Sequence, residues 1–517
     1  MLPDRNARMD STLTPAAPPP AARVHPPGAR TWLALAFVLL YCVILVCYMG
    51  GYAGGSDTSG YLNNARVLAQ GRVTIPMRIV PGLGPESLPA YAYVPLGFIP
   101  DQEHATLTPT YPTGLPLLVM GVSQVVGWKH GPGLVMGLHA LLGLWLVYRL
   151  ARAMGLDAGW AGLGTVVLAA SPLYIFLSLH PMSDLPALVW VTAAIYFAWV
   201  SRDRPWLALA AGAAFGMAVL VRPTNLLAIV PLLLAIGFSL RRWLLLILGG
   251  LPQALFLGVF NQAAYGRVFT TGYGSVAAEF SLTVVPGTLL HYAIWLPVVL
   301  TPLIVLAPGL PVLGRRDARL TGLVMAWALI FPVFYLFNIH THEAWWLLRF
   351  LFPAFPALIV AALLVANALI ARFVVPFRSW WLGLAGALAI IHGVAWTRYF
   401  DAHRIGYGEK VYSETSAWMQ KHLPPNAVVT AMQTSGALFY YTRFTLVRWD
   451  ALTPSDSKRV AQACAAAGQP LYAVLFPFEF EEAPWNAFAK HLTGHWTQVG
   501  AIRQVSIWRL DSSDAAP

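Results

Sequence analysis

Two aspartates lie beside apolar segments of this sequence, and they are the strongest candidates for catalytic residues. Asp57 lies a few residues after the first apolar segment, and Asp184 lies in a short loop between two later ones. An ionised carboxylate in or beside a membrane is energetically costly, so its presence there indicates a specific role. One such role is that of a general base that takes the proton of a hydroxyl group. The structural alternative is a helix cap that accepts hydrogen bonds from free backbone N–H groups. Both interpretations can hold if Ser56 or Thr58 caps the helix instead of Asp57.

Two arginines lie in comparable places. Arg222 occupies a Leu-Val-Arg-Pro-Thr turn between two apolar segments, and Arg349 lies shortly after a pair of tryptophans. An isolated arginine in such a turn needs an anionic partner. Arg222 either forms a structural ion pair with a carboxylate such as Asp184 or binds an anionic ligand such as a phosphate, which suits the guanidinium fork. Arg349 is a second candidate for the same ligand.

Histidines accompany both groups. His180 precedes Asp184 by four residues and is a candidate wall of the same site. Residues 340–343 read His-Thr-His-Glu, a spacing that can bind a metal, but two histidines separated by one residue are weak evidence alone. We therefore predict no metal site, and we group His342 and Glu343 with the substrate-binding candidates.

The composition identifies the elements that must position these residues. Only 11% of the 517 residues are charged and 57% are hydrophobic, whereas about 25% are charged in an ordinary soluble domain. This excludes a disordered chain and a single soluble domain, and predicts an α-helical polytopic membrane protein. The net charge of +11 is spread over short loops, which disfavours a nucleic-acid partner. The three cysteines form neither a disulfide framework nor a zinc pattern.

Apolar runs predict about eleven transmembrane helices. They cover residues 31–49, 132–150, 158–177, 184–200, 206–221, 225–240, 243–264, 290–312, 320–338, 351–371 and 380–397. Alternate loops carry Arg149, Arg152, Arg202, Arg204, Arg241, Arg242, Arg315, Arg316, Arg319, Arg372 and Arg378. By the positive-inside rule these loops and the N-terminus are cytoplasmic. Residues 1–30 are interpreted as a disordered cytoplasmic tail, and the first span as a retained anchor rather than a cleaved signal peptide.

Two regions outside the spans complete the predicted organisation. The long extracytoplasmic loop 50–114 belongs to a transmembrane domain of residues 31–398 and contains an amphipathic helical stretch at Ser59–Gln70. The short apolar run after it suits an interfacial or re-entrant helix. Residues 399–517 predict an extracytoplasmic α/β domain. Its predicted strands are 427–432, 443–449, 471–476 and 499–510, and its predicted helices are 414–422, 456–467 and 483–492.

Several of these segments, in this order, resemble motifs of the GT-C superfamily of polytopic glycosyltransferases, especially bacterial relatives of protein O-mannosyltransferase and lipid A aminoarabinose transferase. The segments are Gly55-Ser56-Asp57 with Tyr61, Ala65 and Gly71; Tyr111-Pro112-Thr113-Gly114-Leu115-Pro116-Leu117-Leu118; His180-Pro181-Met182-Ser183-Asp184; Gly212 to Gly216 with Leu220-Val221-Arg222-Pro223-Thr224; and Arg349-Phe350-Leu351-Phe352-Pro353. The resemblance covers roughly residues 30–400. Many relatives carry an acidic pair in the first loop, but here Thr58 follows Asp57, so a divalent metal is not indicated and no cofactor is predicted.

The resemblance implies transfer of a sugar from a polyprenyl-phosphate donor to an extracytoplasmic acceptor, with inversion of the anomeric centre. The predicted location is the bacterial inner membrane, with a cytoplasmic N-terminus. Asp57 would be the catalytic base, Asp184 would position acceptor or donor, and arginines would hold the lipid phosphate. The predicted substrate-binding residues are Tyr61, Arg66, Tyr111, His180, Arg222, His342, Glu343 and Arg349. The acceptor stays open between a protein, a lipid and a glycan.

Two other functions remain open at this stage. A transporter or flippase of a lipid-linked sugar would use the same charged residues along a translocation path, although the sequence shows no internal repeat of the kind typical of transporters. A non-catalytic relative would instead act as a scaffold for a cell-envelope complex. Asp57→Asn separates these classes, because it should abolish transfer by an enzyme and leave a scaffold unaffected.

Overall fold

The computed structural model describes residues 29–313, 317–373 and 378–511. The predicted N-terminal tail lies outside these residues up to position 28, as do Arg315 and Arg316 of the predicted cytoplasmic loops. The first helix, α1 (Ala29–Tyr48), coincides with the first predicted span. It is apolar along its length, as a membrane anchor requires.

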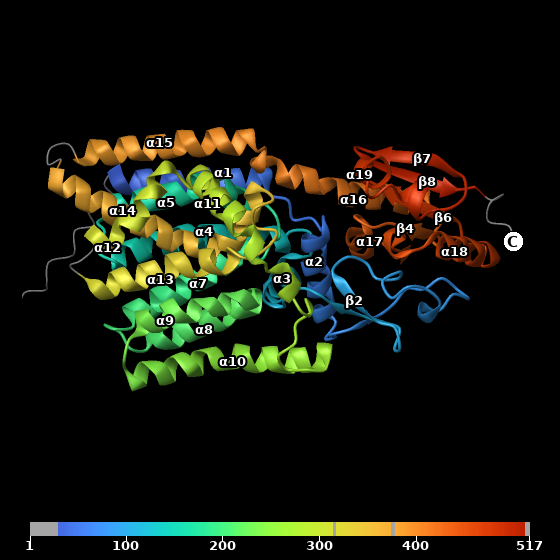
Figure 1. Ribbon diagram of the computed structural model, residues 1–517, viewed down its shortest axis with the longest axis horizontal. Helices are drawn as coiled ribbons and strands as arrows, with labels where there is room; N and C mark the ends of the chain where they lie inside the picture. The colour runs from blue at the N-terminus through green and yellow to red at the C-terminus, as the bar shows by residue number, and fades with distance from the viewer. Residues whose placement is uncertain (1–28, 314–316, 374–377, 512–517) are drawn as a thin grey trace, which may run out of the picture. The chain divides into compact units, whose positions relative to one another are not determined.

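Apolar helices of varied length dominate residues 131–399 (Figure 1). They are α4 (Gly131–Ala153), α5 (Ala158–Ala170), α6 (Pro172–Ser178), α7 (Asp184–Val200), α8 (Leu207–Val221), α9 (Ile229–Ile236), α10 (Leu240–Tyr265), α11 (Val285–Val299), α12 (Leu310–Leu313), α13 (Ala318–Tyr335), α14 (Phe355–Phe373) and α15 (Arg378–Tyr399). In the described part of the chain, 6 helices are long and apolar enough to cross a membrane, or 7 if the bent pair α5–α6 is one span. The other predicted spans coincide with shorter apolar helices, so the count of eleven stays a prediction.

One predicted span, 290–312, is broken. Helix α11 ends at Val299, Thr301 is extended, and a 3-10 helix (Pro302–Gly309) leads into α12. Proline explains the break, because Pro302 forces the residue before it out of the helical conformation and cannot donate a backbone hydrogen bond itself. The apolar pattern continues across the break, which is why hydropathy alone does not show it.

The loop after α1 is ordered. It holds α2 (Ser56–Ala69), which the amphipathic pattern predicted, and a sheet of β1 (Ile75–Pro76), β2 (Phe98–Asp101) and β3 (Thr106–Pro109) in the order β1-β3-β2. This small antiparallel sheet was not predicted. The loop ends in α3 (Gly114–Val126), whose 13 residues are fewer than the roughly 20 that a span needs.

The C-terminal segment has the predicted α/β character. It contains α16 (Ile405–His422), β4 (Val428–Thr430), α17 (Ser435–Tyr441), β5 (Thr445–Val447), α18 (Pro454–Ala466), β6 (Leu471–Leu475), α19 (Pro477–Phe480), α20 (Ala487–Lys490), β7 (Trp496–Ile502) and β8 (Val505–Leu510). The sheet order is β5-β4-β6-β8-β7, with β5, β4 and β6 parallel and β8 antiparallel to both of its neighbours.

Two expectations for this segment were wrong. The strand predicted at 499–510 is the hairpin of β7 and β8, whose turn contains Arg503 with a φ of 52° and no glycine. The helix predicted at 483–492 is reduced to the short α20, because Asn486 leaves the helical region and caps α20 by accepting from the Ala489 N–H. Helix α17 was missed altogether.

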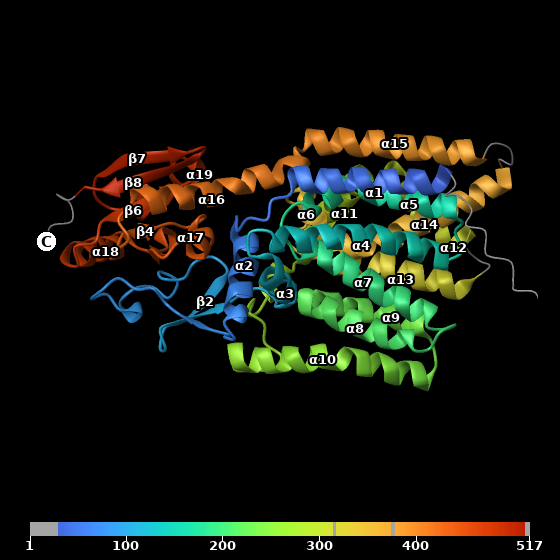
Figure 2. The same cartoon turned by 180° about the vertical axis from the view of Figure 1, so that it is seen from behind.

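The first loop and the C-terminal segment share a hydrophobic core. One buried cluster joins Tyr93 and Phe98 of the loop to Val428 and Val460 of the C-terminal segment. Backbone contacts reinforce the packing, since the Arg448 N–H donates to the Ala92 carbonyl at 2.7 Å. This shared core holds the sheet and the first loop together at one end of the membrane helices (Figures 1 and 2).

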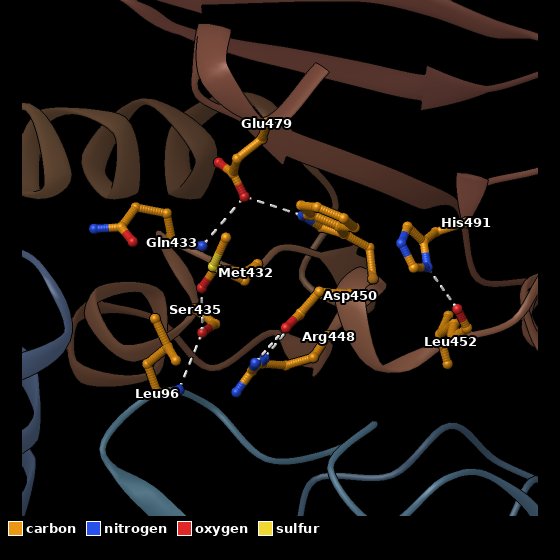
Figure 3. Close-up of polar contacts among 10 residues, drawn as sticks. Leu96, Met432, Gln433, Ser435, Arg448, Asp450, Leu452, Glu479 and His491 are labelled. Atoms are coloured by element: carbon orange, nitrogen blue, oxygen red, sulfur yellow. Dashed lines mark hydrogen bonds and ion pairs between the residues drawn. The ribbon is translucent and has the colours of Figure 1, made fainter. Parts of the chain in front are cut away.

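A buried carboxylate, Glu479, lies at the carboxyl ends of the parallel strands of the C-terminal sheet. Glu479 is 0% exposed and accepts hydrogen bonds from the Gln433 N–H at 3.2 Å and the Trp449 indole N–H at 3.0 Å (Figure 3). The Phe476 N–H donates to its other oxygen at 2.8 Å. These donors lie in the loops that follow β4, β5 and β6, so one side chain ties together the carboxyl ends of the three parallel strands.

Candidate functional site

Helix α2 contains Asp57, the first acidic candidate, and lies where the membrane helices meet the C-terminal segment. It lies crosswise between the membrane helices and the C-terminal segment in both views (Figures 1 and 2). Asp57 is in its first turn, where a negative charge interacts favourably with the helix dipole. Asn63 fixes the helix by donating to the Gly436 carbonyl of α17 at 2.9 Å.

Asp57 is held by a phenol and a guanidinium. The Tyr111 hydroxyl donates to one carboxylate oxygen at 2.7 Å, and the Arg349 guanidinium contacts the other at 3.0 Å. Burial alone would raise the pKa of the Asp57 carboxyl, but Arg349 and the Tyr111 hydrogen bond hold the pKa below its usual value. Asp57 is therefore ionised at neutral pH, as a general base must be.

The second acidic candidate forms the ion pair anticipated as one alternative. Asp184 begins α7 and is 1% exposed, and its carboxylate pairs with Arg222 at the end of α8. Beside it, the Tyr61 hydroxyl of α2 donates to the Ser183 hydroxyl at 2.7 Å. The first loop and the α6–α7 connection thus approach each other through polar groups.

These groups line one cavity of about 350 Å³. Its walls include Asp57, Tyr61, Tyr111, Ser183, Asp184, Arg222, Thr224, Tyr273, Glu279, Tyr335, Asn338 and Arg349. A hollow of about 550 Å³ adjoins it through the shared residues Phe280 and Phe334, and apolar side chains such as Leu227 and Val333 dominate its lining. A charged chamber and an apolar groove therefore lie next to each other and share part of their walls.

Four predicted substrate-binding residues lie outside the cavity lining. Arg66 packs its guanidinium 3.5 Å from the centre of the Tyr440 ring and donates to the Tyr440 carbonyl. His180 is buried, and its Nδ1 lies 2.8 Å from the Phe176 carbonyl. Both side chains have protein partners that explain their positions.

The His-Thr-His-Glu segment also lies apart from the lining. Glu343 pairs with the Nδ1 of His340 at 2.8 Å, and both side chains are about half exposed. His342 is half-buried, and its Nδ1 lacks a hydrogen-bond partner among the described residues. In the described part of the chain, no three His, Cys, Asp or Glu side chains are grouped so that they could hold a metal.

Several lining residues were not predicted. The Tyr335 hydroxyl donates to the Thr224 hydroxyl at 3.1 Å, and its ring stacks on Phe350 at 5.1 Å. The Tyr273 ring packs edge-on against Tyr111, with 6.0 Å between the ring centroids. Thr224 and Phe350 belong to the quoted arginine motifs, although they were not named among the predicted binding residues. Tyr273 comes from the 266–284 connection, which has no comparable signal.

Comparisons with known proteins show which folds and which family this chain resembles. The family described as dolichyl-phosphate-mannose-protein mannosyltransferase matches residues 121–262. ArnT from Cupriavidus metallidurans in the apo state is similar in structure, with a TM-score of 0.60 and 15% identity over 95% of this chain and 100% of that chain. The same protein bound to undecaprenyl phosphate gives a TM-score of 0.59, with 15% identity over 95% and 100% of the two chains.

A third similar structure is the arabinofuranosyltransferase AftD from Mycobacteria, with a TM-score of 0.53 and 15% identity over 95% of this chain and 40% of that chain. No curated protein matches the sequence. The chain thus has the fold of the GT-C glycosyltransferases, and its resemblance to that superfamily is confirmed at the level of the fold.

Proposed function

We propose that this protein is a membrane glycosyltransferase that moves a sugar from a polyprenyl-phosphate carrier to an extracytoplasmic acceptor. The observation that carries the proposal is the cavity in which two aspartate–arginine pairs meet beside an apolar groove. A donor with an anionic head and a long apolar tail needs both environments next to each other. The structure of ArnT bound to undecaprenyl phosphate supports this assignment, because that protein has a similar fold.

Arg222 and Arg349 would hold the donor phosphate. Each guanidinium has five N–H donors, and each spends only part of them on an aspartate. The Nε of Arg349 is buried and has no hydrogen-bond partner among the described residues. A phosphate between the two arginines would satisfy such donors, and its isoprenoid tail would lie in the adjoining apolar groove.

Asp57 would be the general base. A phosphate that competes for Arg349 loosens the ion pair of Asp57 and leaves its carboxylate available to the acceptor. Asp57 then takes the proton of the acceptor hydroxyl while the hydroxyl oxygen attacks the anomeric carbon. The bond between that carbon and the phosphate oxygen breaks, and the arginines stabilise the charge that develops on the leaving phosphate. A single displacement of this kind inverts the anomeric centre.

Asp184 and Tyr61 would position the residues that line the cavity. Asp184 keeps Arg222 oriented, and Tyr61 links α2 to the start of α7 through Ser183. We place the cavity on the extracytoplasmic side of a bacterial inner membrane, with the N-terminus in the cytoplasm. This orientation is supported by the arginines of alternate loops, which the positive-inside rule places in the cytoplasm.

A transfer assay tests the proposal. Purified protein in nanodiscs receives radiolabelled polyprenyl-phosphate sugars and a membrane extract as the acceptor pool. Wild type and Asp203→Asn, an exposed aspartate in the loop after α7, should move label to an acceptor, and Asp57→Asn should not. Absence of transfer by the wild type with every donor, while the lipid still binds, would contradict the proposed function and favour a transporter or a scaffold.

A further inference from the structure

A carboxylate from the C-terminal segment reaches the helix that carries Asp57. Glu409 of α16 accepts hydrogen bonds from the Gly55 N–H and from the Thr58 hydroxyl, both at 3.1 Å and both at the same oxygen. Glu409 and Gly55 are 354 residues apart in sequence. The first N–H groups of a helix have no partner within the helix, and Gly55, the N-cap of α2, has no side chain with which to cap it. Glu409 supplies the missing carboxylate.

The backbone around Gly54 is shaped to admit this side chain. A Cβ built on Gly54 would lie 1.3 Å from a carboxylate oxygen of Glu409, so no larger residue fits at position 54 beside this side chain. Helix α16 is itself closely docked, because a Cβ on Gly50 would lie 2.4 Å from the Gly406 Cα. The glycines therefore let α16 approach until Glu409 touches α2.

Glu409 touches α2 but does not line the cavity. Asp57 faces the cavity with Tyr111 and Arg349, whereas the contacts of Glu409 are to Gly55 and Thr58. Burial raises the pKa of Glu409, the two hydrogen bonds oppose the rise, and the nearby charge of Asp57 adds to it. Glu409 is therefore close enough to influence Asp57, yet it acts through the helix.

We propose that Glu409 is a positioning residue that holds the first turn of α2, and with it the Asp57 carboxylate, in the orientation needed for proton transfer. The inference rests on the proposed glycosyltransferase function. It also assigns a role to Thr58, which occupies the position after Asp57 and links that turn to Glu409. The C-terminal segment thus contributes to the active site without touching the substrate.

Two single variants and their combination test the role. Glu409→Ala removes the carboxylate, and Gly54→Ala displaces it sterically while leaving it in the chain. Each should lower kcat on the order of tenfold to a hundredfold, because small misplacements of a reacting group have effects of this size. The KM for the donor should stay within about twofold, since the arginines are untouched. The double variant should be no worse than Glu409→Ala, because the added methyl group then has room.

Two further variants separate positioning from stability. Glu409→Gln keeps an oxygen that can accept both hydrogen bonds and should restore kcat to within about threefold of the wild type. Glu414→Ala removes a carboxylate of the same helix that pairs instead with Arg503 at 2.8 Å, and it should leave kcat unchanged. Equal kcat for Glu409→Ala and wild type, strictly additive effects of the two alanine substitutions, or failure of Glu409→Gln to restore kcat would overturn the inference.

Amide hydrogen exchange gives a readout that does not need catalysis. Exchange in the peptide that covers residues 56–60 should accelerate in Glu409→Ala and Gly54→Ala, and should stay at the wild-type rate in Glu414→Ala. Unchanged exchange in the first two variants would overturn the positioning role even if no sugar transfer were found. A wild type without transfer but with this exchange pattern would contradict the proposed function and leave the role of Glu409 in ordering α2 supported.

Discussion

Asp57 and Glu479 are two carboxylates in very different surroundings, since the Asp57 side chain is 31% exposed and Glu479 is 0% exposed. Asp57 faces a cavity, and a guanidinium and a phenol contact its two oxygens. Glu479 lies in the C-terminal sheet region with no exposed surface, and three neutral N–H donors surround it. Opposing pKa shifts follow, since Arg349 helps to lower that of Asp57 whereas burial raises that of Glu479 to about 7.

The comparison shows that burial and a shifted pKa do not identify a catalytic acid or base. Such shifts are common at functional sites, but structural networks produce them too. Glu479 satisfies backbone and indole donors at the ends of three strands and lines neither the charged chamber nor the apolar groove. Asp57 combines ionisation, a cavity and two arginines within reach of one ligand. That combination, rather than either shift alone, is the basis on which we propose Asp57 as the general base.

Substitution of each carboxylate by an amide should give the largest difference in kcat between the two positions. Asp57→Asn should lower kcat by about 10²–10⁴-fold, which is the usual contribution of a general base. Glu479→Gln should change kcat by less than about threefold at pH 7, because the side chain at this position lies outside the cavity that holds the reacting groups. Sugar-transfer rates of both variants, normalised to folded protein by size-exclusion chromatography, check this prediction. Similar losses in the two variants would remove the distinction.

Arg222→Ala should have the next largest effect. It leaves the Asp184 charge buried without its partner, and removal of one member of a buried ion pair costs about 3–5 kcal/mol. The apparent Tm in detergent should fall clearly, and affinity for polyprenyl phosphate should weaken. The double variant Arg222→Gln/Asp184→Asn removes both charges, so it should recover much of the Tm but none of the affinity. Recovery of affinity by the double variant would contradict a phosphate-binding role for Arg222.

Arg349→Gln should move the pH profile of transfer. The pKa of Asp57 is lowered partly by the Arg349 charge, so removal of that charge raises this pKa. A base acts only when ionised, and activity is lost as the pH falls through its pKa. The acidic limb of kcat/KM should therefore shift to higher pH in Arg349→Gln, with a smaller rate at every pH. A limb that stays in place would mean that another group sets it.

Glu479 should produce the smallest effect, and only in stability. The pKa of its carboxyl is raised by burial to about 7 in the folded protein, against roughly 4.3 in an unfolded chain. The folded state therefore binds the Glu479 proton more tightly than the unfolded state does. The stabilisation that this proton provides is complete below about pH 4.3 and is lost as the pH rises to about 7. The apparent Tm of the wild type should fall over this range more steeply than that of Glu479→Gln. Parallel Tm profiles would contradict the raised pKa.

Local patterns predicted the helices and the individual motifs. The amphipathic stretch predicted α2, the apolar runs predicted the membrane helices, and the two loop motifs identified Asp57 and Asp184 as site candidates. These features depend on residues that are close in sequence. The hairpin of β7 and β8 escaped because its turn at Arg503 contains no glycine or proline, so the β pattern looked continuous.

Long-range contacts decided the rest of the site. Arg349 was recognised as a phosphate candidate, but nothing near it in sequence indicates that it pairs with Asp57. Glu409 has no local signal at all, because its role depends on the docking of α16 against the start of α2. Arg66 illustrates the opposite error of inference, since it follows Asp57 on the same helix but points to Tyr440 of α17. Position on a helix alone does not place a side chain in a cavity.

The proposed function requires that the lipid phosphate bind between Arg222 and Arg349 and release Asp57. The most direct measurement is a cryo-EM structure of the protein in nanodiscs with undecaprenyl phosphate. The expected result is phosphate density in contact with both guanidinium groups, an isoprenoid tail in the groove lined by Phe280 and Phe334, and a lengthened contact between Asp57 and Arg349. Phosphate density elsewhere, or an unchanged ion pair of Asp57 beside a bound phosphate, would contradict it.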